Sequence, residues 1–438
     1  MPLHAPPVIG YLTNARHPRR FAALDSPVSA TPVSPKPANI AASPLRIGSI
    51  DAYRGLVMLL MMAEVLRLSK VAANLPGSRF WAFLAEQQSH VPWAGCTLHD
   101  LIQPGFSFLV GAALPFSLAS RAARGQSRWQ VLAHALWRAA FLVLLGVFLR
   151  SMSKTQTNWT FEDTLSQIGL GYVPLVLIGM TRQRWQWIAF GTILVGYWLA
   201  FVLYPLPSRD FDYADYGVPP NWPYFYQGFD AHWNKNSNLA WAFDTWFLNL
   251  FPRPAPFTHN AGGYATLSFI PTLATMILGL IAGGWIKQAG SVWNKAVWMV
   301  LAGGMGLLIG FIAHESGLCP CVKRIWTPSW VFYSGGWCFL FLAAFYTLID
   351  AAGWRAWSFP LRVIGANSIL AYLVAHGWEQ FIQNSLRIHF SHFLASKDIF
   401  APTAGLAPYA PLLAGLATLV VLWLFLYWLY RQRIFVRI

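Results

Sequence analysis

The sequence predicts an all-α integral membrane protein, a polytopic bundle of about ten helices that encloses a polar cavity. Of the 438 residues, 56% are hydrophobic and only 11% are charged, whereas a soluble domain has about 25% charged residues. Trp and Phe are abundant, with 23 and 31 copies, as expected where helix ends meet membrane interfaces. The net charge is +15, but basic residues are scattered singly between apolar runs, which argues against a nucleic-acid partner.

Two regions are expected along the chain. Residues 1–45 contain Pro and Ala throughout and no long apolar run, which predicts a disordered, basic tail in the cytoplasm. Residues 46–438 are expected to form one transmembrane domain, because a span needs ~20 mostly apolar residues. The candidate spans are 47–68, 98–120, 129–150, 163–181, 185–206, 262–286, 296–315, 329–350, 360–378 and 409–430.

The connections between these spans carry an orientation signal. Lys and Arg gather in the N-terminal tail, in the short connections at 121–128, 182–184, 287–295 and 355–362, and after residue 430. Cytoplasmic connections of membrane proteins are enriched in these residues. Both termini are therefore expected in the cytoplasm, in a multi-pass protein of the cell (inner) membrane. The long loop 207–261, together with His90 and Asp100, is then expected on the outer face.

Charged residues interrupt the first two apolar runs. Asp51 and Arg54 lie one turn apart in the first run, and Asp100 opens the second. Ionisable residues in membrane helices are costly and are functional candidates by default, although they also serve helix packing or topology. Because an unpartnered Arg is expensive to bury, Arg54 is expected to pair with Asp51 or Asp100.

His90 lies in the connection between these two runs. An imidazole at the mouth of a membrane bundle suits general-base or acyl-carrying chemistry at neutral pH, and a carboxylate such as Asp100 can orient the ring. The alternative is a histidine that only bonds the loop backbone. Later spans also contain polar residues: His134, Arg138, Gln167, Asn367, Ser368 and His376. Such a bundle is expected to enclose a polar cavity, as enzymes and transporters both do.

Several familiar motifs are missing from the sequence. It contains no Walker sequence, no GxSxG and no HExxH. Its four cysteines include no C-x-x-C pair, so no metal site is expected.

Other motifs follow one another in a fixed order. The stretch 49–56 is SIDAYRGL, and His90 to Gly111 contains Trp93, Gly95, Thr97, Asp100 and Pro104. The series continues with Gln167-Ile168-Gly169 and Pro320-x-x-Lys323-x-x-Trp326. It ends with GANSILAY at 365–372, followed by His376, and YRQRIF at 430–435. In this order the motifs resemble those of the heparan-alpha-glucosaminide N-acetyltransferase family of transmembrane acyltransferases, with the chain as a divergent, bacterial-type member. The resemblance covers residues 46–438 and is weak over 185–260.

The resemblance implies a donor, an acceptor and a site. The donor is acetyl-CoA from the cytoplasm, and the acceptor is the amine or hydroxyl of a glucosamine-like sugar or cell-surface glycan on the outer face. The family's active-site histidine falls on His90, as base or transient acyl carrier, with Asp100 or Glu64 to orient it. Glu64 stands where the family usually has an asparagine-containing turn. The residues expected to bind substrate or CoA are Asp51, Arg54, Trp93, Gln167, Lys323, Trp326, Asn367, Ser368 and His376.

Two other functions fit parts of the pattern. The related membrane O-acyltransferases that decorate cell-surface polysaccharide share an Arg-Gly first helix and differ in acceptor. A glycan or lipid transporter or flippase also needs a polar cavity, but the 49–120 pattern has no repeat in the second half, as many transporter folds would have. The acceptor, the acyl chain and the choice between a covalent acyl-histidine and direct transfer stay open. The resemblance is compatible with a homodimer.

Overall fold

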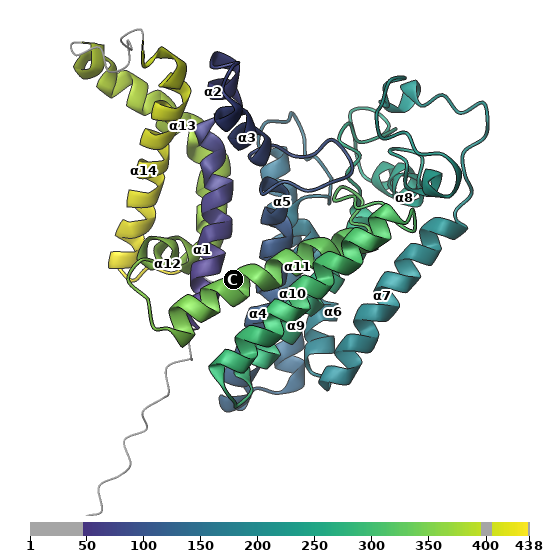
Figure 1. Cartoon of the computed structure of the whole chain (residues 1–438), viewed down its shortest axis with the longest axis horizontal. Coiled ribbons are helices and arrows are strands. Elements are labelled where there is room, and N and C mark those ends of the chain that lie inside the picture. Colours follow the sequence, from purple (N-terminus) through teal and green to yellow (C-terminus); the bar gives the residue numbers. More distant parts are fainter. Residues whose placement is uncertain (1–46, 396–404, 437–438) are drawn as a thin grey trace, which may run out of the picture. The chain divides into compact units, whose positions relative to one another are not determined.

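A computed structural model describes residues 47–395 and 405–436, and the tail expected at 1–45 lies outside this range. Regular structure in the described residues is helical, which confirms the all-α prediction (Figure 1). The α-helices are α1 Gly48–Met62, α2 Leu68–Asn74, α3 Arg79–Gln87, α4 Ile102–Ala123, α5 Arg128–Ser151, α6 Thr164–Gly179, α7 Gln183–Leu203, α8 Leu239–Phe247, α9 Phe269–Lys287, α10 Val292–Glu315, α11 Pro328–Phe345, α12 Phe359–Ala366, α13 Ser368–Ala395 and α14 Ala410–Arg431.

Most of the long helices can cross a membrane. Within the described ranges, 7 are long and apolar enough: those containing α4, α5, α7, α9, α10, α11 and α14. The pair α12 and α13, bent by 82° around Asn367, adds one more span if it crosses as a unit. The remaining two predicted segments fall on α1, with 15 residues, and α6, with 16 residues. The chain is therefore a multi-pass membrane protein, and each predicted segment is helical.

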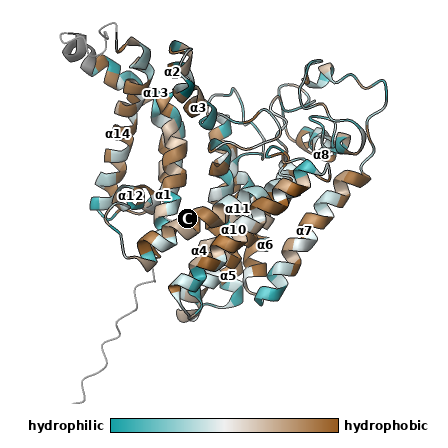
Figure 2. Cartoon of the chain, in the orientation of Figure 1, coloured by the Kyte–Doolittle hydropathy of each residue, from teal (hydrophilic) through white to brown (hydrophobic). Residues whose placement is uncertain are grey.

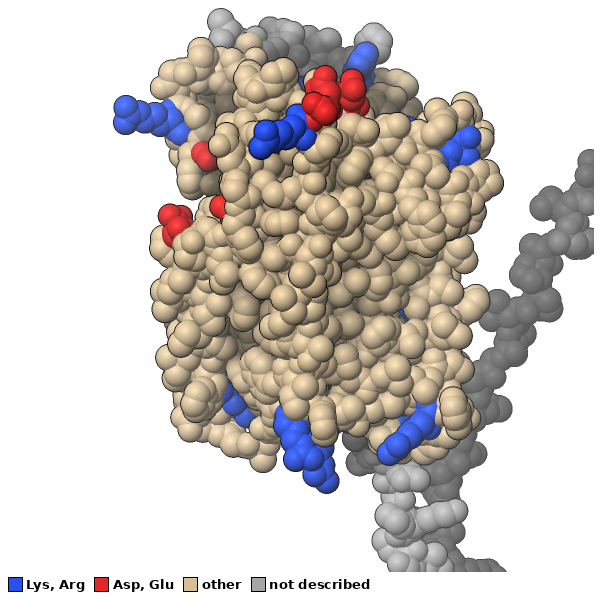
Figure 3. All heavy atoms as spheres, turned by 90° about the vertical axis from the view of Figure 1, so that its right-hand side faces the viewer, with Lys and Arg blue, Asp and Glu red and all other residues tan. Residues whose placement is uncertain are grey.

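The outward surfaces of these helices are apolar. Trp298, Leu308 and Phe311 of α10 are exposed, as are Val195 and Leu199 of α7, and both helices are largely brown in Figure 2. Figure 3 shows the side of the molecule that lies on the right in Figure 1. Lys and Arg side chains lie near the upper and lower ends of this side, and almost no charged side chains lie between them. An uncharged belt between two charged rims suits a surface in contact with lipid tails.

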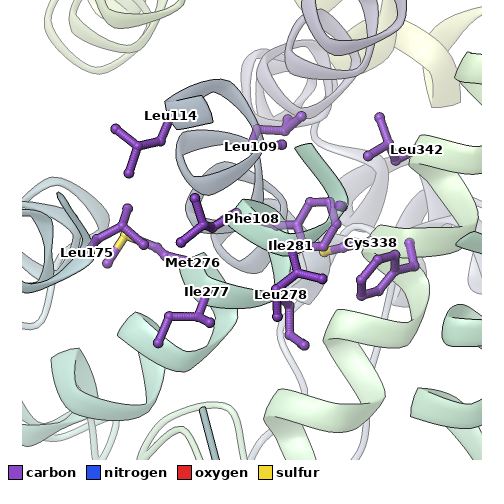
Figure 4. Close-up of a cluster of buried hydrophobic side chains, with 14 of the residues drawn as sticks. Phe108, Leu109, Leu114, Leu175, Met276, Ile277, Leu278, Ile281, Cys338 and Leu342 are labelled. Atoms are coloured by element: carbon purple, nitrogen blue, oxygen red, sulfur yellow. The ribbon is translucent and has the colours of Figure 1, made fainter. Parts of the chain in front are cut away.

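Two apolar cores hold the bundle together. The larger core joins α4, α5, α6, α9 and α11, and Phe108 of α4 packs there near Met276 and Ile281 of α9 (Figure 4). The smaller core joins α1 to α12, α13 and α14. Helix α1 contributes to both, since Tyr53 faces the larger core and Met58 the smaller. The two cores therefore meet along α1.

Glycines allow α4 and α9 to pack backbone against backbone. A Cβ atom on Gly279 would lie 1.8 Å from the carbonyl oxygen of Phe108, and one on Gly111 would lie 1.8 Å from that of Met276. Real Cβ atoms do not approach backbone oxygens so closely, so even an added methyl group would push the helices apart and open the larger core.

We therefore expect Gly279→Ala to lower the melting temperature and yield of the detergent-purified protein, at a cost of about 1–3 kcal/mol or more. Gly284 lies on the same helix, and a Cβ atom there would meet nothing within 4 Å. Gly284→Ala should keep or slightly raise the melting temperature, because Ala is the better helix former. Equal melting temperatures for the two variants would contradict this packing.

The loop 207–261 folds onto the end of the bundle that carries His90. Trp233 of the loop is fully buried and stacks on Phe201 of α7, with ring centroids 4.8 Å apart. The indole nitrogen of Trp93 donates to the carbonyl of Trp233 at 3.2 Å. The loop and the segment around His90 therefore share one core, which holds the site described next.

Candidate active site

The candidate site is a cavity of about 160 Å³. Helices α1, α4, α5, α6 and α13 and the loops between helices contribute to its wall. The lining residues are Met61, Glu64, His90, His99, Ile102, Gln103, Phe106, Arg150, Glu162, Asp163, Thr164, Tyr264, Lys323, Tyr372 and His376.

Asp100 holds the ring of His90. Nδ1 of His90 lies 2.7 Å from Oδ1 of Asp100, whose side chain is only 1% exposed. The other oxygen, Oδ2, accepts hydrogen bonds from the backbone N–H groups of Val91 and Thr97 and lies 3.0 Å from the Thr97 hydroxyl, which donates to the Ser89 carbonyl at 2.6 Å. One buried carboxylate thus organises the segment from His90 to Asp100 and fixes the direction of the imidazole.

Lys323 completes this cluster. Its Nζ atom lies 3.2 Å from Oδ1 of Asp100 and 3.2 Å from Nδ1 of His90. One ring nitrogen cannot donate to the carboxylate and also accept from Lys323, and the shorter contact favours donation from Nδ1–H to Asp100. The lone pair is then on Nε2 of His90, which no described residue engages. This tautomer leaves a basic nitrogen for the cavity.

The surroundings of His90 favour its neutral form. Burial lowers the pKa of the imidazole below its ordinary value, and the Lys323 ammonium lowers it further, whereas Asp100 acts in the opposite direction. Burial also lowers the pKa of Lys323, which the Asp100 carboxylate opposes. His90 is therefore in the form that a general base requires at neutral pH.

A second imidazole lies beside the first. The ring centroids of His90 and His99 are 4.5 Å apart, and Nε2 of His99 lies 3.3 Å from Oε1 of Glu64. Glu64 thus contacts His99 directly, whereas the sequence pointed to Glu64 as a partner of His90.

A larger cavity of about 430 Å³ lies farther along the same helices. Arg54 and Asp51 line it and pair at 3.1 Å, which confirms the predicted ion pair. Arg138 also lines it, donates to the Tyr172 hydroxyl at 3.1 Å and lies over the same ring. The rest of the wall is mostly apolar, with Val110, Ala113, Leu114, Leu142, Leu165, Ile168 and Ile369. We call this the inner cavity and the one around His90, which lies at the end of the bundle that the loop 207–261 covers, the outer cavity; the names refer to the bundle and not to the sides of a membrane.

Three residues line both cavities: Phe106, Thr164 and Tyr372. Along α4, Phe106 is followed by Val110, Ala113 and Ser117 on the wall of the inner cavity. Positions three or four apart share one helix face, so one face of α4 follows both cavities. The two cavities are therefore neighbours, separated by side chains.

The other predicted site residues separate into two groups. Lys323 and His376 line the outer cavity, and Ser368 lines the inner one. Trp93, Gln167, Trp326 and Asn367 are buried and line neither cavity. Their polar groups bond within the protein instead: Trp93 with Trp233, Gln167 with Ala265 and Thr272, Trp326 with Thr275, and Asn367 with Ile434 and Val436. These four hold the walls in place.

Sequence reasoning missed several cavity residues. The sequence could have indicated His99 as a site residue, because it directly precedes Asp100 in the motif. Asp163 begins α6 as its N-cap and accepts from the backbone of Leu165 and Ser166, a role that its position before an apolar run can indicate. Arg150 and Tyr264 gave no signal, because only the folded chain brings them to the cavity.

Two curated proteins are similar to the chain over most of its length. A human protein named heparan-alpha-glucosaminide N-acetyltransferase is 24% identical over 408 residues, 82% of this chain and 57% of that protein. A mouse protein of the same name is 24% identical over 395 residues, 80% of this chain and 56% of that protein. The chain is distantly related to these transferases. It spans just over half of their length. No family model matches the chain.

Proposed function

We propose that the chain moves an acetyl group from cytoplasmic acetyl-CoA to the amine or hydroxyl of a sugar on the outer face of the cell membrane. The observation that carries this proposal is the His90–Asp100–Lys323 cluster, in a cavity that shares its wall with a second, basic cavity in the same bundle. The distant relationship to N-acetyltransferases supports a glucosamine-type acceptor.

The inner cavity suits the donor. Arg54 and Arg138 offer guanidinium groups there, and guanidinium recognises phosphate oxygens in a bidentate manner. The apolar part of the wall fits the narrow pantetheine arm. A donor in this position brings its thioester towards Phe106 and Tyr372, the residues common to both cavities.

The outer cavity suits the acceptor. Nε2 of His90 takes the proton as the acceptor nitrogen or oxygen bonds to the acetyl carbon, and Asp100 stabilises the imidazolium that forms. The carbon–sulfur bond then breaks, and the thiol of CoA is released. Lys323 holds Asp100 in its ionised form, so the ring keeps its direction during the step.

Charge distribution supports the proposed orientation. Arg121, Arg124, Arg182 and Lys287 lie at helix ends or in short connections, whereas the loop 207–261 packs beside His90. The positive-inside rule then places both termini in the cytoplasm and the outer cavity on the opposite side.

The proposal is tested by acetyl transfer with the purified protein in detergent. Labelled acetyl-CoA is offered with a panel of amino sugars, N-blocked sugars and neutral glycans. Label on free amines supports N-transfer, and label on N-blocked sugars supports O-transfer. If no acceptor is labelled and acetyl-CoA is neither bound nor hydrolysed, the enzyme proposal is wrong, and glycan or lipid flux into vesicles is the next measurement.

The pH dependence of this activity follows from the lowered pKa of His90. The acid limb of the rate profile is expected below pH ~6.5, the ordinary value for His. Lys323→Met should raise its midpoint, since a cation that disfavours the imidazolium is removed. A lowered folded-state pKa also means that stability falls as pH drops below ~6.5, because the unfolded chain then binds the proton more tightly. An acid limb above pH ~6.5 in the wild type, or a downward shift in the variant, would contradict this account.

A further inference from the structure

His99 and Glu64 form a second histidine–carboxylate pair in the outer cavity. Nε2 of His99 lies 3.3 Å from Oε1 of Glu64, and the two side chains are 9% and 54% exposed. With Nε2 turned towards Glu64, Nδ1 is the ring nitrogen of His99 that remains for other partners. No described residue makes a hydrogen bond to Nδ1, and His99 is one of the residues that line the cavity. Of the three histidines that line this cavity, His90, His99 and His376, the first two thus each contact a carboxylate of their own.

The position of His99 differs from that of His90 in one respect. His99 lies in the 3₁₀ turn His99–Leu101 that leads directly into α4, whereas His90 lies in the loop before that turn. Phe106 lines both cavities, and it shares the wall of the outer cavity with His99. A thioester that extends from the inner cavity past Phe106 therefore enters the cavity that His99 lines.

We propose that His99, held by Glu64, is the general acid that protonates the departing sulfur, while His90 is the base for the acceptor. This assignment rests on the proposed acetyl transfer. As the acceptor nitrogen or oxygen bonds to the acetyl carbon, its proton passes to Nε2 of His90. The carbon–sulfur bond breaks with both electrons on sulfur, and Nδ1–H of the His99 imidazolium supplies the proton that completes the thiol. Solvent then takes the proton from His90 and returns one to His99.

Two imidazoles whose ring centroids are 4.5 Å apart can serve as separate base and acid in one reaction step. One of them lies beside the Lys323 ammonium, and the other lies beside the Glu64 carboxylate. A single histidine would have to change its proton partner between the acceptor and the sulfur. The pair removes and supplies protons at the same time, at two points of the cavity.

A purely structural His99 would behave differently. The His99–Glu64 contact also ties the 3₁₀ turn Ala63–Leu66 to the start of α4. If that were its whole role, its loss would slow transfer from every donor alike. A general acid matters most when the leaving thiolate is basic, so its loss is rescued by a donor with a more acidic thiol.

The test compares two donors in His99→Asn, Glu64→Gln and wild type. The donors are acetyl-CoA and S-phenyl thioacetate, whose thiophenol leaves readily as the anion. His99→Asn is expected to lose about 10²-fold in rate with acetyl-CoA and less than about fivefold with the phenyl thioester. Glu64→Gln should lose less, with the same dependence on donor. His90→Ala should lose activity with both donors.

A pH profile with acetyl-CoA alone gives a second readout. The charged and titratable groups around the His99 ring are Glu64, His90, Asp100 and Lys323, with Arg150, Glu162, Asp163, Tyr264, Tyr372 and His376 on the rest of the cavity wall. The wild-type rate should fall at alkaline pH, and His99→Asn should lose that limb while keeping the acid limb of His90. Equal losses with both donors, or an unchanged alkaline limb in His99→Asn, would overturn the proposal. Absence of any acetyl transfer by the wild type would instead refute the proposed function.

Discussion

Replacing His90 with Ala is expected to lower the rate of acetyl transfer about 10²- to 10⁴-fold, the range that a positioned general base contributes. The side chain is 39% exposed to the cavity, and its removal leaves Asp100 paired with Lys323. The fold should therefore survive, and the loss should appear in kcat more than in KM. Rates are measured with labelled acetyl-CoA and the best acceptor from the panel, beside melting temperatures in detergent.

A histidine away from the cavity provides the matched control. His259 lies in the loop 207–261, contacts the Thr258 hydroxyl and lines neither cavity. His259→Ala should transfer acetyl at the wild-type rate. If His90→Ala keeps most of the activity while folded, His90 is not the base.

Replacing Asp100 with Ala is expected to reduce both stability and activity. The carboxylate is buried and accepts hydrogen bonds from four residues, His90, Val91, Thr97 and Lys323, and the Lys323 side chain is only 5% exposed. Loss of the carboxylate leaves a buried ammonium uncompensated, which costs about 3–5 kcal/mol. It also frees the His90 ring and the segment that carries it. Thermal unfolding in detergent measures the first effect, and the transfer rate measures the second.

A double variant separates these two effects. Asp100→Ala with Lys323→Met removes both charges, and apolar replacement of a buried pair is often neutral in stability. Compared with Asp100→Ala alone, the double variant should regain most of the lost melting temperature but little of the lost transfer activity. Glu379→Gln provides the control, since Glu379 pairs with Arg67 at a half-exposed position where such pairs are worth only about 0–1 kcal/mol. An Asp100→Ala variant that melts no lower than Glu379→Gln would contradict the role of Asp100.

Much of the fold could be predicted because lipid imposes a strict rule on sequence. A segment that crosses hydrocarbon must be apolar for ~20 residues, so the spans are visible without knowledge of their neighbours. The break around Asn367 was not predicted, since 360–378 was expected as one span, whereas α12 and α13 are bent by 82° there. Its cause was not visible, because the Asn367 side chain bonds to Ile434 and Val436, 67 and 69 positions farther along the chain.

Only the part of the candidate site that is formed by residues close together in the sequence could be predicted. His90 and Asp100 are ten positions apart, so a single loop brings them together. Lys323 is 223 positions from Asp100, and only the family resemblance drew attention to it. The resemblance suggested a contact with CoA phosphates or the acceptor, whereas Lys323 pairs with Asp100. Trp93, Gln167 and Trp326 were expected to bind ligand, but a motif does not distinguish a side chain that lines a cavity from one that supports its wall.

The central claim is that one bundle joins a cytoplasmic donor to an acceptor on the outer face. Oriented proteoliposomes test it directly, with labelled acetyl-CoA on the side of the chain termini and an impermeant amino sugar on one side at a time. We predict acetylated sugar when donor and acceptor are on opposite sides, and none when both are on the side of the termini. Transfer only between substrates on the same side, or none in either arrangement, would contradict the account.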